Sequence, residues 1–304
     1  MQNFTNKDIA ILGSTASGKT KLSLKLAQDF NAIILSLDSL SLYKEINIAS
    51  AKPTKIERAN IVHFGIDELN INEYFNSALF SNLYHKAKKY ALNNHKNLII
   101  VGGSSFYLKS LCEGLSPMPV PGKDIENQIF DILSDLQKAY NLIKEKDFMY
   151  AKNITNSDKY RIEKWYKIFL STNLTATKYF EKNKREKKIN QIKIFEIQTQ
   201  RELLKKRIKV RTEKMISDGL IDEAYFLEKK YSRVPKAMKS IGLKESLEYL
   251  DGKITLEVLS DKISNATAGL AKRQKTFNKS QFKNVARGDK DKIYDFAKFY
   301  LQNN

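Results

Sequence analysis

The segment from Gly13 to Thr20 has the residue types and the spacing of a phosphate-binding loop. It reads Gly-Ser-Thr-Ala-Ser-Gly-Lys-Thr, which matches the pattern G-x-x-x-x-G-K-[ST]. The glycines let successive backbone N–H groups turn toward one phosphate, and a following helix presents its N-terminus to the same anion. Lys19 supplies a positive charge to the terminal phosphate, and the Thr20 hydroxyl is a ligand for Mg²⁺. We therefore predict a diphosphate or triphosphate site with bound Mg²⁺, formed by Gly13, Ser14, Thr15, Ala16, Ser17, Gly18, Lys19 and Thr20.

Apolar runs on both sides of this loop predict the elements that position it. Residues 8–12 form a short apolar run that ends at the loop, and residues 22–27 continue with amphipathic helical spacing. Further buried strands are predicted at residues 32–37 and 97–101, with a long amphipathic helix at about 74–93 between them. Strands that alternate with helices indicate a parallel sheet with helices on its faces.

Each predicted strand is followed by a residue suited to a binding crevice. Gly13, Asp38 and Gly102 stand directly after the three strands. In a parallel sheet ligands bind beyond the carboxyl ends of the strands, so these positions should converge. The carboxylate of Asp38 has two possible roles at this point. It is either a general base or, like the acidic residues after strands in P-loop NTPases, a partner of the bound metal.

The second part of the chain is mainly helical. A proline-rich break at residues 117–121 precedes helical periodicity over residues 124–185. Residues 193–197 can return to the sheet as a strand, and helices are predicted at about 201–218 and 256–279. The expected fold is α/β, a P-loop NTPase-like parallel sheet flanked by helices, with a helical insertion subdomain. The predicted borders are a core domain of residues 1–120 plus 190–304 with basic C-terminal helices, and an insertion of residues 121–189.

The charge of the chain suits a polyanionic partner. There are 53 Lys and Arg against 34 Asp and Glu, a net charge of +19. Residues 1–120 hold only 13 of those basic and 9 of those acidic side chains, so most of the excess lies in the remainder. Such a field favours nucleic acid. A compositional bias toward Lys, Asn and Ile is the alternative explanation of the total.

Other features restrict the class of protein. Cys112 is the single cysteine, which excludes an internal disulfide framework and a thiolate zinc cluster. No stretch reaches the roughly 18 apolar residues of a membrane span, and the N-terminus lacks the pattern of a signal peptide. We expect a soluble, cytoplasmic protein with no membrane partner.

Several further segments occur in the order and with the residues of a known family. The chain resembles the bacterial tRNA dimethylallyltransferases from about residue 10 to residue 280. Jointly, these matches are far more specific than the phosphate loop. They are Asp38-Ser39-Leu40-Ser41-Leu42-Tyr43, residues 48–54, residues 101–108, Asp158 to Lys164, Arg201 to Glu223, residues 240–245 and residues 272–277.

The resemblance implies a reaction and its substrates. In that family a dimethylallyl group moves from dimethylallyl diphosphate to the exocyclic amine of the adenosine at position 37. This base lies 3′ to the anticodon in tRNAs that read codons beginning with U. Diphosphate is released. The implied partners are dimethylallyl diphosphate and the anticodon loop of tRNA, the implied cofactor is Mg²⁺, and the family is usually monomeric.

The resemblance also implies roles for individual residues. Asp38 would be the general base, since a carboxylate that accepts the proton of a poorly nucleophilic amine helps by about 10²–10⁴-fold. Lys19 and Thr20, the latter as metal ligand, would stabilise the charge on the leaving diphosphate. Arg207 and Arg211, four apart on one predicted helix, are candidates to hold the same anion, and a solvated basic face is the alternative.

Contacts to tRNA are expected in three segments. They comprise Asp38, Ser39, Leu40, Ser41 and Ser104 around the base, Tyr160, Arg161 and Lys164 on the insertion, and Lys272 and Arg273 near the C-terminus. The basic run 272–287 also contains Phe277 and Phe282, which suits phosphate contacts combined with stacking. A solvated helix end is the alternative for that run.

Four departures from the family pattern concern substrate contacts. Ser41 stands where the family has a glutamine, and Phe277 stands where it has a tryptophan. Lys164 replaces an arginine, which loses bidentate phosphate geometry. The arginine that follows the proline-rich stretch is absent near Glu126.

Two rival functions share the phosphate loop. A P-loop kinase for a small molecule would bind ATP and transfer its phosphoryl group, but it leaves the basic second half unexplained. A non-prenylating, RNA-binding NTPase would use both the loop and the positive charge.

Overall fold

In the computed structural model, residues 6–114, 116–183, 189 and 192–303 are described. The chain separates into two compact units, one formed by residues 1–112 with 189–304 and the other by residues 113–188. The first unit contains a parallel sheet of six strands in the order β3-β2-β4-β1-β5-β6 among the described residues. The strands are β1 (Asp8–Gly13), β2 (Ala32–Leu37), β3 (His63–Phe64), β4 (Asn97–Gly102), β5 (Ile192–Ile197) and β6 (Ala286–Gly288).

The central strands are buried on both faces, as their continuous apolar runs predict. Every residue of β1, β2 and β4 is buried. Gly102 lies at the carboxyl end of β4, where a Cβ atom would come within 2.2 Å of the Leu37 carbonyl oxygen. Only glycine allows this close approach of two strands. The parallel strands β1, β2 and β4 end side by side at Gly13, Leu37 and Gly102, and Asp38 follows β2 directly.

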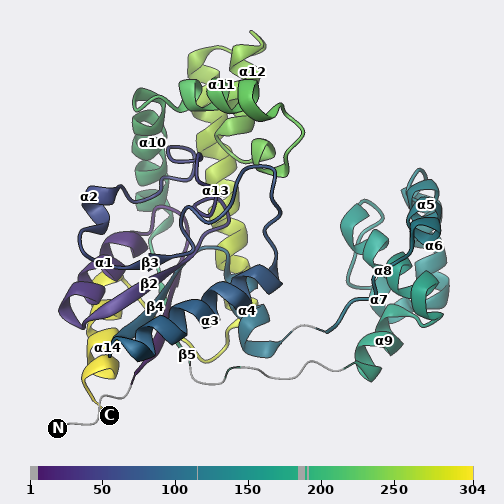
Figure 1. The fold of residues 1–304 in the computed structure, drawn as a ribbon. Helices are drawn as coiled ribbons and strands as arrows, with labels where there is room; N and C mark the ends of the chain where they lie inside the picture. The colour runs from purple at the N-terminus through teal and green to yellow at the C-terminus, as the bar shows by residue number, and fades with distance from the viewer. Residues whose placement is uncertain (1–5, 115, 184–188, 190–191, 304) are drawn as a thin grey trace. The chain divides into compact units, whose positions relative to one another are not determined.

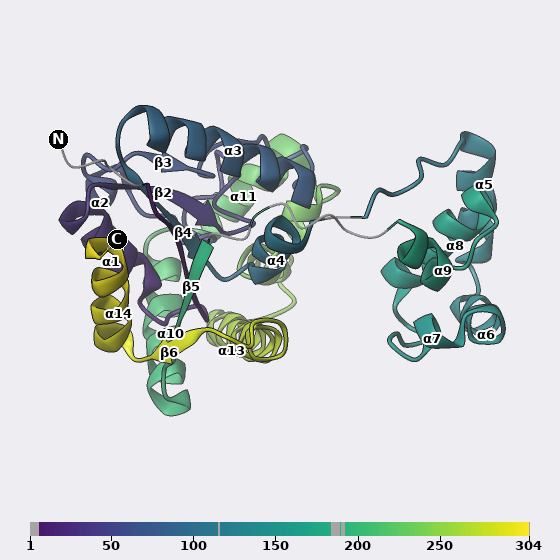
Figure 2. The same ribbon diagram turned by 90° about the horizontal axis from the view of Figure 1, so that it is seen from below.

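Two layers of helices cover the sheet (Figures 1 and 2). On one face, Ile9, Ile11 and Ile99 pack with side chains of α1 and α14. On the other face, Leu12 and Ile100 pack with side chains of α3, α4, α11, α12 and α13. These helices are α1 (Lys19–Asp29), α3 (Ser77–Asn93), α4 (Ser105–Glu113), α11 (Leu220–Tyr231), α12 (Leu243–Leu250), α13 (Leu256–Gln281) and α14 (Lys290–Gln302).

The remaining elements of the first unit frame the carboxyl ends of the strands. Helix α10 (Arg201–Ser217) packs along α13, and both supply side chains to the cavities described below. The short α2 (Lys55–Arg58) follows a loop of residues 38–54, and the 3₁₀ turn η1 (Lys236–Lys239) precedes α12. Helix α10 ends one residue before the predicted end, and Gly219 follows with a left-handed φ of 100°.

The second unit is helical and has its own core. Trp165, Ile143 and Ile162 are fully buried in it. The buried carboxylate of Asp147 accepts a 3.0 Å hydrogen bond from Trp165 Nε1 and bonds from Thr177. Burial works against ionisation, yet these hydrogen bonds hold the pKa of Asp147 below its usual range. Its helices are α5 (Lys123–Ile132), α6 (Leu136–Lys146), α7 (Phe148–Ala151), α8 (Lys159–Thr172) and α9 (Ala176–Lys182).

The predicted fold class is confirmed. The α/β sheet flanked by helices is present, and the strand predicted at residues 193–197 pairs with β1 as β5. The structure adds β3, β6 and α14, which the apolar pattern did not predict. Within the described ranges, the helices are too short or too polar for any of them to cross a bilayer.

Candidate active site at the phosphate loop

The phosphate loop connects β1 to α1 in a strained, inward-curled conformation. Ala16 and Gly18 both have left-handed φ values, 64° and 91°, and the Ser17 N–H donates to the Ser14 carbonyl at 3.1 Å. A left-handed alanine costs on the order of 1–3 kcal/mol, and such strain is typical of ligand-binding loops. Helix α1 begins at Lys19 with neither a side-chain cap nor an acidic residue in its first turn. Its N-terminal N–H groups therefore remain available for an anion.

Two cations face this loop without a carboxylate partner. Lys19 Nζ donates to the Ser14 carbonyl at 3.2 Å, and Arg211 reaches the same cavity from α10. Burial lowers the pKa of Lys19 to about 8, although the charge of Asp38 opposes the shift and Arg211 adds to it. Burial also lowers the pKa of Arg211, again against the effect of Asp38. Within the part of the chain that the structure describes, neither side chain lies within 4.0 Å of a carboxylate.

Asp38 is fixed at the carboxyl end of β2. Its Oδ1 atom accepts hydrogen bonds from the backbone N–H groups of Leu40, at 2.8 Å, and Ser41, at 3.3 Å. This turn orients the carboxylate, while Oδ2 accepts no hydrogen bond from the described residues. A fixed carboxylate with one uncommitted oxygen is suited to accept a proton from a bound substrate.

Two cavities meet at Asp38. They share Thr15, Asp38, Ser50 and Arg211 as lining residues. The smaller has a volume of about 60 Å³ and adds Lys19, Thr20, Ser41, Ala51 and Pro53, among others. The larger, of about 200 Å³, has mostly apolar walls and adds Ser39, Leu40, Ser104, Ile208, Met215, Ile241, Ile263, Leu270 and Gln274, among others.

The loop of residues 43–53 forms a wall of both cavities, and a buried lysine supports it. Lys52 Nζ donates to the Tyr43 carbonyl at 2.8 Å, to Asn47 Oδ1 at 3.1 Å and to Asp67 Oδ1 at 2.6 Å. Arg58 bonds the second oxygen of Asp67 at 3.2 Å. Although burial opposes ionisation, these cations hold the pKa of Asp67 below its usual range. Lys52 is thus a structural cation of the loop.

The structure brings together most of the predicted site residues. Those that line the two cavities are Thr15, Lys19, Thr20, Asp38, Ser39, Leu40, Ser41, Ser104 and Arg211. Gly13 and Ser17 are buried within the loop itself. Arg207, one turn before Arg211, is exposed and lines neither cavity. Of the predicted pair, the structure therefore places Arg211 alone in the crevice.

The predicted tRNA-contacting residues that do not line the two cavities all lie on helices. Lys272 and Arg273 are exposed on α13. Tyr160, Arg161 and Lys164 lie on α8 of the second unit, where Arg161 pairs with Asp158 at 3.0 Å and Lys164 lies over the Phe180 ring. The contacts of these residues with tRNA stay predictions.

The expected stacking on a base is wrong for Phe282, and Phe277 is half-buried. Phe282 is buried, and Phe277 packs against the same hydrophobic core, with the two ring centroids 6.5 Å apart. Both rings therefore stabilise the end of α13. Arg287, at the end of the basic run, pairs with the buried Glu196 at 2.7 Å.

Gln274 is a site residue that the sequence did not identify. Its Oε1 atom accepts a 2.9 Å hydrogen bond from the backbone N–H of Thr15. A Cβ atom on Gly103 would come within 2.3 Å of Gln274 Nε2, so this glycine makes room for the amide. The residue belongs to the segment 272–277 that carries the family resemblance, but its backbone partner lies 259 positions earlier. Spacing alone gives no signal for such a contact.

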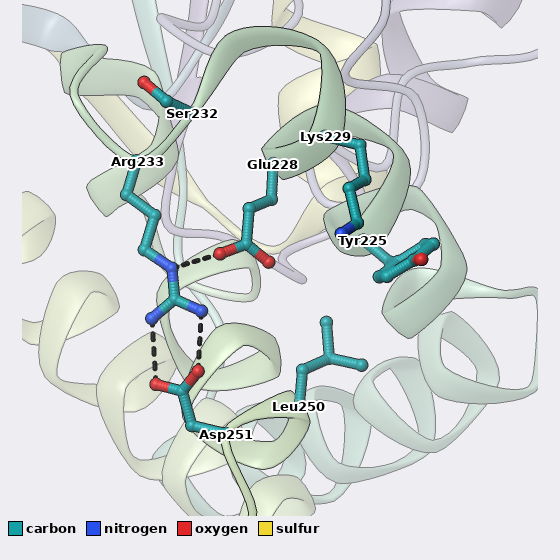
Figure 3. A pocket seen from close by; sticks show the side chains of 7 residues that line it. All are labelled: Tyr225, Glu228, Lys229, Ser232, Arg233, Leu250 and Asp251. Carbon is teal, nitrogen blue, oxygen red and sulfur yellow. Dashed lines mark hydrogen bonds and ion pairs between the residues drawn. The ribbon is translucent and has the colours of Figure 1, made fainter.

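A larger hollow lies elsewhere, near the ends of α11 and α12, and has a different character (Figure 3). It has a volume of about 500 Å³, and Arg233 in its wall is neutralised by two carboxylates. The guanidinium of Arg233 forms two bonds of 2.6 and 2.8 Å to Asp251 and a further bond to Glu228. Lys229, the other cation drawn, lies over the Tyr225 ring, with its Nζ atom 5.3 Å from the ring centroid.

Comparison with known proteins identifies the family of the chain. The family model described as IPP transferase matches residues 41–281. A tRNA dimethylallyltransferase of Aliarcobacter butzleri is 56% identical over 279 residues, 91% of this chain and 93% of its own length. The enzyme of that name from Sulfurimonas denitrificans is 48% identical over 94% of this chain and 97% of its own length.

Solved structures show the same fold. A tRNA delta(2)-isopentenylpyrophosphate transferase from Staphylococcus epidermidis aligns with a TM-score of 0.70 at 28% identity, over 98% of this chain and 99% of its own. A eukaryotic dimethylallyltransferase, studied acting on tRNA, aligns with a TM-score of 0.79 at 26% identity, over 94% of this chain and 74% of its own. The fold and the crevice thus define a P-loop transferase.

The chain belongs to the IPP transferase family. The family model covers the loop after Asp38, the insertion, α10 and α13, which include most elements that line the two cavities.

Proposed function

We propose that this chain is a tRNA dimethylallyltransferase. It transfers the dimethylallyl group of dimethylallyl diphosphate to the exocyclic amine of adenosine 37 in tRNAs that read codons beginning with U. The observation that carries the proposal is the pair of half-buried, unpaired cations, Lys19 and Arg211, beside a fixed carboxylate, Asp38. Family membership supports it. We infer that the enzyme acts in the cytoplasm and, as the resemblance implies, as a monomer.

The diphosphate of the donor occupies the smaller cavity. The lone pair of the adenosine amine attacks the first carbon of the allyl group while the carbon–oxygen bond breaks. The electron pair of the carbon–oxygen bond goes to the diphosphate. The growing charge of the diphosphate is stabilised by loop N–H groups, Lys19 and Arg211. Gln274 supports this step indirectly, since it holds the Thr15 backbone in place.

The acceptor adenine occupies the larger cavity. Its apolar walls suit the faces of a base, and Ser39, Ser104 and Gln274 offer polar groups to its edges. An enzyme reaches such an amine only after the base is extruded from its stack. Asp38 lies at the junction of the two cavities, where its Oδ2 atom accepts the amine proton as the new bond forms.

The residues of the smaller cavity also fit Mg²⁺. The Thr20 hydroxyl and the Asp38 carboxylate both line it, and Mg²⁺ prefers such oxygen ligands together with substrate phosphates and water. When bound, the ion would neutralise charge on the leaving diphosphate. Thr20 would hold it directly.

Binding of tRNA uses the basic surface around this crevice. Lys272 and Arg273 stand on α13 beside Gln274, where their charges suit the phosphates flanking an extruded base. Tyr160, Arg161 and Lys164 of the second unit contact the same RNA, as the resemblance implies.

The direct test is incorporation of label from radiolabelled dimethylallyl diphosphate into unmodified tRNA without ATP. The proposal expects label in tRNA and an equal amount of released diphosphate. Label absent from tRNA, with phosphoryl transfer or hydrolysis when ATP is added, would support the kinase or NTPase functions instead. A tRNA with guanosine at position 37 is the matched control and should remain unlabelled.

A further inference from the structure

The loop between β2 and α2 needs partners from outside itself. Residues 44–53 form no strand or helix, although Ala49 and Ser50 line the larger cavity and Ser50 and Ala51 line the smaller. Ala51 has a left-handed φ of 44°. A non-glycine residue keeps such a conformation only where surrounding contacts enforce it. The position of this wall therefore depends on contacts from elsewhere in the fold as well as on the bonds of Lys52 within the loop.

One carboxylate supplies three of these contacts. Glu223 Oε2 accepts the backbone N–H groups of Asn47 and Ile48, both at 2.8 Å, and Glu223 Oε1 accepts that of Ala49 at 2.9 Å. Three successive N–H groups that converge on one anion form a nest, and hydrogen bonds to a charged acceptor are stronger than neutral ones. Glu223 lies in the first turn of α11, where the helix dipole favours negative charge.

The helix that carries Glu223 follows closely on the helix that carries Arg211. Helices α10 and α11 are joined only by Asp218 and Gly219. A Cβ atom on Gly219 would lie 3.8 Å from Ile48, so the loop packs closely against this junction. Residues 49–51 and Arg211 are therefore both positioned by the junction between α10 and α11.

We propose that Glu223 is a positioning residue for the transfer reaction. It holds residues 47–49 so that Ser50 and Ala51 close the cavities opposite Arg211, with Asp38 between the two substrates. This inference rests on the proposed function for its kinetic consequence. It assigns to Glu223 no contact with either substrate.

The first test separates positioning from general stability. In Glu223→Ala, hydrogen exchange at the amides of residues 47–49 should accelerate by at least about tenfold, while the amides of β1, β2 and β4 keep their protection. kcat/KM for tRNA should fall by about 100-fold, the cost of a misplaced wall, and the Kd for pyrophosphate should change by less than about threefold. Glu223→Gln keeps one oxygen for Asn47 and Ile48, so its loss should be about tenfold.

The control is Asp222→Asn, which removes an exposed carboxylate from the same turn and should alter neither measurement. Retained protection at residues 47–49 or an unchanged kcat/KM in Glu223→Ala would overturn the proposal. If Glu223→Ala does not fold, Glu223→Gln decides by the same two readouts. If wild-type protein transfers no dimethylallyl group at all, the proposed function fails, whereas the exchange data still decide whether Glu223 anchors the loop.

Discussion

The crevice at the phosphate loop and the hollow around Arg233 differ in whether carboxylates pair with their buried or clustered cations, Lys19 and Arg211 in the first and Arg233 in the second. In the hollow, Arg233 is neutralised by Asp251 and Glu228 (Figure 3). In the crevice, Lys19 and Arg211 are partly removed from water, and among the described residues no carboxylate lies within 4.0 Å of either. Yet the hollow is the larger, about 500 Å³ against about 60 and 200 Å³.

We infer from this contrast that unsatisfied charge identifies a ligand site better than volume does. A desolvated cation without a partner is unfavourable in the free protein, so such an arrangement persists where a bound anion compensates it. A paired set of charges on the surface has no such need, and its contribution is small.

The largest effect should come from the carboxylate between the two substrates. Asp38→Asn retains the oxygen that accepts the Leu40 and Ser41 N–H groups but cannot take the amine proton. Single-turnover transfer to tRNA should slow by about 10²–10⁴-fold, with pyrophosphate affinity unchanged. A variant that keeps the wild-type rate would show that Asp38 serves the metal or the fold instead.

Removal of a crevice cation should have the next largest effect. Arg211→Met keeps much of the side-chain volume but loses a charge that faces the leaving group. We expect kcat to fall by about 10²-fold, as for loss of one preorganised electrostatic contact. Arg207→Met, one turn away and exposed, is the matched control, and a rate loss equal to that of Arg211→Met would contradict the assignment of one cation to the crevice.

Removal of the paired cation in the hollow should change the reaction least. Arg233→Met breaks surface ion pairs and leaves the crevice untouched. The transfer rate should stay within about twofold of wild type, since exposed pairs contribute little. A large loss of tRNA binding in this variant would assign the hollow to substrate and remove the contrast between the two regions.

A smaller effect should appear in the pH dependence of stability. Lys19 has a pKa of about 8 in the folded protein against the ordinary value of 10.5, so its charged form is disfavoured by folding. The unfolded chain then binds more protons between these values, and the ligand-free protein should gain stability as pH rises through this window. As the pH rises above 8, the melting temperature of wild type should increase relative to that of Lys19→Met. Parallel curves would show that Lys19 is not desolvated.

The sequence was most informative where a local pattern decides the structure. The apolar runs that became β1, β2 and β4 are buried on both faces, so their limits at Gly13, Asp38 and Gly102 followed from composition. The phosphate loop has its signature within eight consecutive residues. These two features were sufficient to place Lys19 and Asp38 in one crevice.

Residues that act through tertiary contacts could not be found in this way. Gln274 bonds a residue 259 positions away, and Glu223 bonds residues 174 to 176 positions away. Arg207 and Arg211 are equivalent by helical spacing, and only the docking of α10 along α13 decides which of them faces the loop. Phe277 and Phe282 lie in a basic run that suggested stacking, but the apolar requirement of the core was stronger.

The central claim is that the unpaired cations of the crevice bind the diphosphate of a prenyl donor. Its most direct test is a titration of wild type, Lys19→Met and Arg233→Met with an unreactive thio analogue of dimethylallyl diphosphate and, separately, with ATP, each with Mg²⁺. We predict that the analogue binds wild type and Arg233→Met equally and at least tenfold more tightly than ATP, and that Lys19→Met loses this binding. Tighter binding of ATP, or analogue binding that persists in Lys19→Met, would contradict the account.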